Sequence, residues 1–213
     1  MLKQFFKKIG ISYKRAKKTI MQNNKWKYYM DKVLQIKSMK AWAENGYGDL
    51  YFYDESGFSL DSNIPYRWSP KGEPAQIPAN RFNKRINVLA FLNTKTKDLF
   101  HTMTTDRVNT DIVINLFDDF AKQLKKPTVV VLDNASVHTS KNFKACIVKW
   151  EKLGLHLLYL PPYSPELNHI EILWREMKYN WVNLNALDSF DNLKEHVSKL
   201  LNAFGGKYDI NFC

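Results

Sequence analysis

Two aspartates in this 213-residue chain follow apolar runs that have the composition of buried strands. Asp54 comes directly after LYFY (residues 50–53), and Asp133 comes directly after TVVVL (residues 128–132). If these strands are neighbours, both carboxylates reach one spot, where a raised pKa or a bound cation must relieve their repulsion. Carboxylate oxygens suit Mg²⁺ or Mn²⁺ rather than zinc. The two aspartates therefore indicate a divalent metal site.

A third carboxylate is expected from the segment LPPYSPELNHIEILW (residues 160–174), which follows the last predicted strand. Glu166 and Glu171 are both candidates. Glu171 falls in the first turn of a predicted helix, for which Asn168 is the expected N-cap. Each acid also has a plain structural interpretation. Asn168 and Glu171 fit a capping box, and the two aspartates could belong to turns.

Apolar periodicity predicts the elements that position these acids. Strands are expected at 50–53, 85–93, 98–105, 128–132 and 155–160, with a long loop at 61–84, and helices at 110–124, 139–153, 168–182 and 189–204. This order, β-β-β-α-β-α-β-α, predicts an α/β fold: a mixed sheet of five strands with helices on both faces. Three acids that converge at one edge of such a sheet favour a catalytic site over three unrelated structural roles.

Positive charge is concentrated at the start of the chain. Residues 1–40 hold twelve of the 32 Lys and Arg but one acid, so the whole net charge of +11 lies there. Residues 1–22 are predicted to form a basic helical arm, and 23–46 a linker helix. The arm suggests nucleic acid as a partner, with phosphate contacts expected from Lys14, Arg15, Lys17 and Lys18. A solvated basic helix, or a weak membrane-surface helix, is the alternative.

Composition excludes several other classes of protein. Two cysteines cannot form a disulfide framework, and the chain has no CxxC pair for a thiolate zinc site. The longest apolar runs are too short to span a bilayer, so no membrane partner is expected. An apolar content of 45% with 14% aromatic residues is enough to build a core.

Three stretches resemble the catalytic domain of DDE-type transposases of the mariner superfamily, in the branch of bacterial insertion sequences. They are YDESGF (53–58) with RWSPKG (67–72), VLDNA (131–135) with His138, and LPPYSPELNHIE (160–171) with Trp174. The last stretch is the most specific of the three. The resemblance covers roughly residues 50–180, and it places the catalytic domain at 47–213.

The resemblance implies an RNase H-like, retroviral-integrase-like fold, with Asp54, Asp133 and Glu171 as the catalytic and metal-binding triad. It favours Glu171 over Glu166 and implies two Mg²⁺ ions, with Mn²⁺ as a substitute. The implied activity is DNA strand cleavage and strand transfer at insertion-sequence ends. The implied partners are double-stranded DNA, as element ends and target, and a second copy of the chain in a homodimer on DNA. The implied location is the bacterial cytoplasm, in association with the nucleoid.

Two departures from the family pattern open an alternative. His169 stands where the family usually has proline, and residues 1–22 resemble only the tail of a helix-turn-helix region. The alternative is a truncated remnant that only binds DNA or associates with full-length transposase. An RNase H-like nuclease unrelated to transposition is a third hypothesis, which the PPYSP motif disfavours.

Five further residues are candidate DNA contacts. Arg67, Trp68 and Lys71 lie in the long loop, where charge and stacking could hold DNA. Asn134 and His138 follow Asp133 and could contact the scissile phosphate or orient a ligand. A locally packed surface loop explains the first three equally simply, and loop hydrogen bonding explains the last two.

Overall fold

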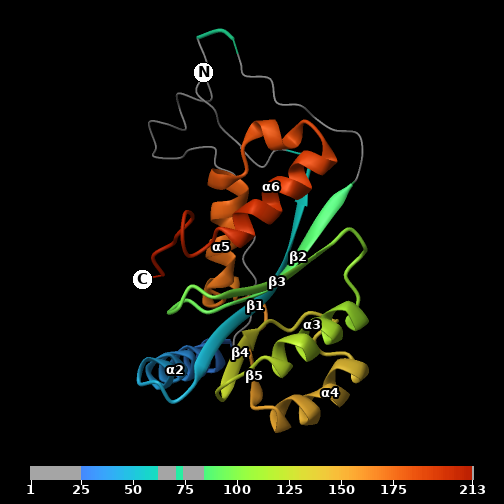
Figure 1. The fold of residues 1–213 in the computed structure, drawn as a ribbon. Coiled ribbons are helices and arrows are strands. Elements are labelled where there is room, and N and C mark those ends of the chain that lie inside the picture. Colours follow the sequence, from blue (N-terminus) through green and yellow to red (C-terminus); the bar gives the residue numbers. More distant parts are fainter. Residues whose placement is uncertain (1–24, 62–70, 74–83, 213) are drawn as a thin grey trace, which may run out of the picture.

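The computed structural model of the chain describes residues 25–61, 71–73 and 84–212. Its strands form a five-stranded mixed sheet in the order β3-β2-β1-β4-β5 (Figure 1). The strands are β1 (Asp49–Ser59), β2 (Arg85–Leu92), β3 (Leu99–Thr104), β4 (Thr128–Leu132) and β5 (Leu155–Tyr159). β1, β2 and β3 pair antiparallel, whereas β4 is parallel to both β1 and β5. The predicted mixed sheet is confirmed.

Helices cover both faces of this sheet, as predicted (Figure 1). They are α2 (Lys25–Glu44), α3 (Thr110–Lys122), α4 (Lys141–Lys152), α5 (Ile170–Glu176) and α6 (Phe190–Asn202). α3 and α4 contribute Phe117 and Trp150 to one buried cluster, and α5 and α6 contribute Leu173 and Val197 to the other. Side chains of a strand alternate between faces, so β1 supplies both clusters.

The alternation along β1 decides where its acids go. Phe52 and Phe58 belong to the cluster under α5 and α6, whereas Tyr51 and Tyr53 belong to the cluster under α3 and α4. Asp54 is therefore on the α5 side of the sheet, and its neighbour Glu55 is on the α3 side.

β1 is longer than predicted, because β2 continues to pair with it. The sequence predicts a strand that ends at Tyr53, but β1 runs to Ser59 with Asp54 opposite Ala90. Its parallel pairing with β4 stops at Phe52 and Val131. Asp54 and Asp133 each lie two residues beyond that last pair, so the two aspartates still meet where β1 and β4 part.

The helix predicted at 168–182 is divided into two parts, α5 and a π-helical turn. A 3₁₀ turn, η1 (Pro165–Leu167), precedes α5, and a π-helical turn, η2 (Met177–Trp181), follows it. A further 3₁₀ turn, η3 (Leu184–Leu187), leads to α6. The N-cap of α5 is His169, which makes no side-chain capping bond, and Asn168 instead donates its Nδ2 to the carbonyl oxygen of Tyr53. The prediction that Asn168 is the N-cap is therefore wrong, and the alternative capping box of Asn168 and Glu171 does not form.

α2 lies within the predicted helix at 23–46. It packs on the sheet through Ile36 and Ala43, which are buried in the same cluster as Phe52. The predicted arm at 1–22, with Lys14, Arg15, Lys17 and Lys18, lies outside the described residues, as do Arg67 and Trp68. In the part of the chain that is described, none of the helices combines the length and the apolar character needed to cross a membrane.

The turn between α2 and β1 depends on the absence of a side chain at Gly48. A Cβ atom there would lie 1.8 Å from the Trp42 ring and 2.3 Å from the carbonyl oxygen of Pro127. We expect Gly48→Ala to lower the free energy of unfolding by about 1–3 kcal/mol, because α2 must shift. Chemical denaturation measures this. Gly206→Ala is the control, because its nearest neighbour would be 3.7 Å away, and equal effects of the two substitutions would contradict the close packing of α2.

Candidate active site

A cavity of about 490 Å³ opens where β1 and β4 part, and all three predicted acids line it. Asp54 comes from β1, Asp133 follows β4, and Glu171 lies in the first turn of α5. Glu166, the other candidate for the third acid, lines a neighbouring cavity instead. The structure thus gathers from distant parts of the chain the set of acids that the motifs indicate.

Asp54 is held by a hydrogen bond from α5. The indole Nε1 of the buried Trp174 donates to its Oδ2 at 3.1 Å. Burial raises the pKa of Asp54 well above its ordinary value, and the nearby carboxylates of Glu55, Glu171 and Asp133 add to the rise. The ionised side chain is therefore costly in the folded protein unless a positive charge lies near it.

Asp133 is held by residues that follow it in the chain, through one of its two carboxylate oxygens. Its Oδ1 accepts from the backbone N–H of Ala135 at 2.9 Å and from Nδ1 of His138 at 2.8 Å. These bonds lower the pKa of Asp133, the bond from His138 most of all. The side chain is about half exposed, so a held carboxylate faces an accessible site.

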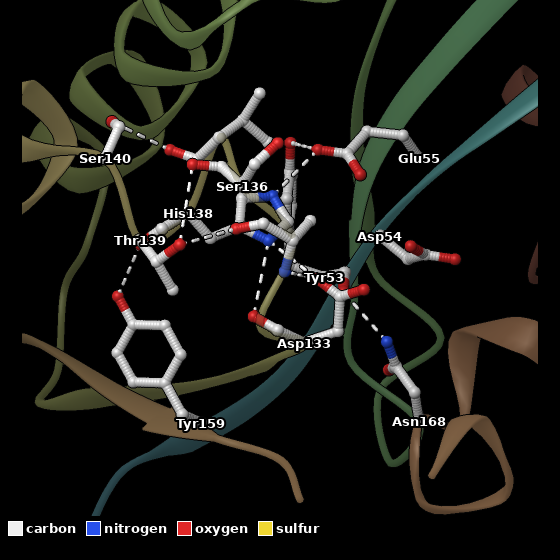
Figure 2. A network of polar contacts seen from close by, with 12 residues as sticks. Tyr53, Asp54, Glu55, Asp133, Ser136, His138, Thr139, Ser140, Tyr159 and Asn168 are labelled. Carbon is white, nitrogen blue, oxygen red and sulfur yellow. Dashed lines mark hydrogen bonds and ion pairs between the residues drawn. The ribbon is translucent and has the colours of Figure 1, made fainter. Parts of the chain in front are cut away.

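His138 joins two carboxylates that lie on either side of its ring (Figure 2). Its Nε2 lies 2.9 Å from Oε1 of Glu55, and Tyr53 donates its hydroxyl to the same oxygen at 2.8 Å. Burial by itself would lower the pKa of His138, but the bonds to Asp133 and Glu55 raise it to about 9. The ring is therefore an imidazolium at neutral pH and donates to both acids.

This placement corrects one interpretation of the sequence. The His138 side chain is 0% exposed and both ring nitrogens have partners, so the predicted contact with DNA does not fit this structure. The other predicted role, to orient a ligand, agrees with its bond to Asp133. Glu55 is a site residue that the sequence analysis missed. Had β1 been expected to continue, strand alternation would have placed Glu55 on the His138 side.

α5 is fixed to the centre of the sheet by the two residues before it. Asn168 is buried and donates to the carbonyl oxygen of Tyr53 at 3.0 Å. The His169 ring stacks on Phe52 with a centroid distance of 4.7 Å. Burial lowers the pKa of His169 to about 4, so the neutral ring accepts at Nε2 from Nζ of Lys40 in α2, 3.2 Å away. These contacts set the position of Glu171 relative to Asp54.

Glu171 itself is exposed at the cavity. Burial nevertheless raises its pKa, Lys178 opposes the rise, and Asp133 adds to it. Lys178 and Arg175 line the neighbouring cavity together with Glu171. Cationic groups therefore begin where the acidic cavity ends.

Asn134 and Lys71 are less tightly defined. Asn134 lines the acidic cavity and donates its Nδ2 to the carbonyl oxygen of Leu160. Lys71 is exposed in the short stretch 71–73. Their contacts with DNA stay predictions.

The three carboxylates line one cavity, but their side chains do not lie close together. Among residues 25–61, 71–73 and 84–212, no three His, Cys, Asp or Glu side chains lie close enough together to form a ready-made metal cluster. Carboxylates that repel each other stay apart until a cation lies between them. The arrangement can bind a charged ligand, and its oxygens are hard donors.

The sheet order and the acid-lined cavity define an RNase H-like catalytic domain, the fold class expected from the sequence. Residues 49–194 match the family model described as DDE superfamily endonuclease. This match spans more than half of the chain, which therefore belongs to the DDE endonuclease superfamily. The DDE superfamily that the three motifs indicate is confirmed.

Two curated relatives resemble parts of the chain. The uncharacterized protein y4pE/y4sA of Sinorhizobium fredii is 32% identical over 68 residues, which are 32% of this chain and 46% of that protein. The uncharacterized 39 kDa protein of insertion element IS630 from Shigella sonnei is 22% identical over 134 residues, which are 60% of this chain and 37% of that protein. The chain thus spans less than half the length of these relatives.

Solved structures of Mos1 transposase share the fold. The paired-end complex with Mg has a TM-score of 0.64 at 17% identity, over 93% of this chain and 61% of that one. The strand transfer complex has a TM-score of 0.62 at 16% identity, over 95% and 62%. The Mos1 catalytic domain alone has a TM-score of 0.55 at 15% identity, over 87% and 84%. The RNase H-like fold is therefore confirmed.

The imidazolium of His138 predicts a pH dependence of stability. Because folding raises its pKa from 6.5 to about 9, its contribution is complete below pH 6.5 and is lost as the pH rises through about 9. We expect His138→Gln to cost about 3 kcal/mol at pH 6 and much less at pH 10, by equilibrium denaturation.

Glu55→Gln tests the same network from the other side. It removes one of the two carboxylates that raise the pKa of His138, so the loss of stability should begin at a lower pH. A cost of His138→Gln that is the same at pH 6 and pH 10 would show that the ring is neutral.

Proposed function

We propose that this chain is the catalytic domain of a transposase that cuts DNA strands at insertion-sequence ends and transfers the cut strands to a target. The observation that carries the proposal is the meeting of Asp54, Asp133 and Glu171 on one cavity, from three separate elements. Membership of the endonuclease superfamily supports cleavage. The likeness to Mos1, described in a strand transfer complex and with a transposon end, supports the finer activity.

The donor set fits a hard divalent cation. All three side chains offer oxygen, and burial with neighbouring acids makes the ionised Asp54 costly without a counter-charge. Oδ1 of Asp133 accepts both of its hydrogen bonds, which leaves Oδ2 without one among the described residues. Mos1 paired-end complexes were solved with Mg and with Mn, which supports the same choice here. When bound, two Mg²⁺ ions, or Mn²⁺ in their place, would supply Lewis-acid activation of the attacking oxygen and stabilise charge on the leaving oxygen.

The chain's own contribution is to fix its acids before a phosphate arrives. Trp174 holds Asp54, and His138 holds Asp133. Pro161 and Pro162 line the same cavity, and their fixed φ angles limit the motion of its wall. Positioning of this kind provides most of the catalysis in phosphoryl transfer. No side chain is required as a covalent nucleophile.

DNA is the partner that this function requires, and Lys178 and Arg175 beside Glu171 could hold its phosphates. A homodimer on DNA, and a cytoplasmic location at the nucleoid, stay predictions from the family resemblance.

Two glutamates of the same segment give a matched test. We expect Glu171→Gln to lower Mg²⁺-dependent strand cleavage by about a hundredfold or more, because a carboxylate at the reacting phosphate is lost. Glu166→Gln removes the same charge five residues away, outside the acidic cavity, and should retain cleavage. Nicking of a supercoiled plasmid, and of a duplex that carries the element's terminal sequence, measures both variants.

The same assay separates the two functions predicted from the sequence. If the unaltered chain binds DNA but cuts neither substrate, the remnant that only binds DNA, or associates with full-length transposase, is the correct interpretation. Equal loss of cleavage in both variants would remove the distinction between Glu171 and Glu166 on which the triad rests.

Asp54→Asn tests the metal site without a cleavage assay. Asparagine keeps an acceptor for Trp174 but has no charge, so at pH 7 without metal it should raise the free energy of unfolding by about 1 kcal/mol or more. The gain should vanish toward pH 4, where the carboxyl of Asp54 becomes protonated in the unfolded chain as well. Added Mg²⁺ should raise the melting temperature of the unaltered chain and not that of the variant. Equal shifts with Mg²⁺ would contradict metal binding at Asp54.

A further inference from the structure

A third cavity lies on the other side of the loop that follows Asp133. It has a volume of about 550 Å³, and Ala135 lines both this cavity and the acidic one. Two guanidinium groups reach it, from Arg85 at the start of β2 and from Arg107 beyond the end of β3. Hydrogen-bonding side chains of Asn87, Thr105 and Ser136 complete its polar lining.

The charge of this cavity is not balanced from within. Both arginines are exposed, and neither forms an ion pair with any other described residue. Glu55, the acid that lines this cavity, has its Oε1 engaged by His138 and Tyr53. Two uncompensated guanidinium groups beside hydroxyl and amide side chains suit an anion with several oxygens, such as a phosphodiester.

The position of Arg85 depends on a glycine in the neighbouring strand. A Cβ atom on Gly57 would lie 1.5 Å from Nε and 2.0 Å from Cζ of Arg85. The guanidinium therefore lies against the bare backbone of β1, in space that any other residue would fill. A glycine within a strand commonly marks such a close approach. The packing restricts Arg85 before a ligand binds, which lowers the entropy cost of binding.

The cationic groups flank the acids on two sides. Glu171 is shared between the acidic cavity and the one lined by Arg175 and Lys178, while Ala135 is shared with the cavity of Arg85 and Arg107. Each cationic cavity thus borders the acidic one through a shared residue. Burial lowers the pKa of Lys178, and Arg85 lies near enough to lower it further. A nucleic acid strand, whose phosphates are regularly spaced, can contact the cationic groups of both cavities while one of its phosphates lies at the acids.

We propose that Arg85 and Arg107 form a phosphodiester-binding site for the DNA strand that continues past the reactive phosphate on the Asp133 side. The site rests on the proposed function, which places the reactive phosphate at the acids. The backbone it holds belongs either to the element end or to the target. Both have the same chemistry, and the experiment distinguishes them.

The test is the salt dependence of DNA binding, which requires no cleavage. The variant Arg85→Gln/Arg107→Gln is compared with Lys125→Gln/Lys126→Gln, which removes the same charge from exposed lysines just before β4, at the opposite end of that strand from Asp133. A plot of log affinity against log salt concentration has a negative slope. We expect the magnitude of this slope to decrease by about 1.8 in the arginine variant, at about 0.9 per phosphate contact, and to stay unchanged in the lysine variant.

Two duplexes identify the source of the phosphates. One carries the terminal sequence of the element, and the other is an unrelated duplex that contains a TA step. If the arginine variant has a smaller slope only on the first duplex, the site binds the element end. If the slope is smaller only on the second duplex, the site binds the target. A smaller slope on both duplexes means that the site binds either DNA. An unchanged slope on both duplexes, or an equal change in the lysine variant, would overturn the proposal.

Gly57→Ala tests the position of Arg85 at constant net charge. The new methyl group displaces the flexible guanidinium from β1, so the slope should fall by about 0.9 while the melting temperature changes little. A slope equal to that of the unaltered chain would overturn the placement of Arg85. Because the slope is measured on binding alone, failure of the cleavage assay and failure of this site are separate results.

Discussion

Asp54, Asp133 and Glu171 repel one another, and the other residues of the site hold them in place against this repulsion. Left to themselves, three carboxylates on one cavity would move apart or take up protons. Trp174 anchors the first and the imidazolium of His138 anchors the second. The two buried clusters, one on each face of the sheet, offset this repulsion, because their packing fixes the elements that carry these side chains. The site therefore keeps its shape while its negative charge is not neutralised. A cation can bind there and can in turn bind a phosphate.

β1 makes this possible because it has a different role on each face. Asp54 is on the side of α5, where it faces the cavity, and Glu55 is on the side of α3, where it holds His138. A single strand thus supplies both an acid of the site and a support for a second acid, Asp133. β2 extends the strand beyond the end of its pairing with β4, so the backbone at Asp54 is held by a ladder although β4 has already ended.

The sequence predicts the sheet and the position of the two aspartates well, because short-range signals carry them, whereas Glu171 is preferred to Glu166 only through the family resemblance. The β-branched run of β4 and the acid that follows it are visible without knowledge of any partner. The failures are all non-local. β1 passes Tyr53 because β2 supplies its partners, and Glu55 joins the site through a histidine 83 residues away. Asn168 has the spacing of a capping residue, but its Nδ2 donates to a buried carbonyl of β1, and its Oδ1, the atom that a cap would use, has no partner among the described residues. The π-helical turn after α5 likewise has no local signature in the pattern of apolar residues.

The bond between Lys40 and His169 joins α2 to the residue that precedes α5. His169 occupies a position where the family pattern has proline, a residue that neither donates there nor accepts through its side chain. In this chain the imidazole stacks on Phe52 and contacts α2 through Lys40, and its Nδ1 has no hydrogen-bond partner among the described residues. Loss of the Lys40 side chain would leave Nε2 unpartnered as well, at a cost of about 1–3 kcal/mol. The pair of Lys40 and His169 therefore couples α2 energetically to the segment that carries Glu171.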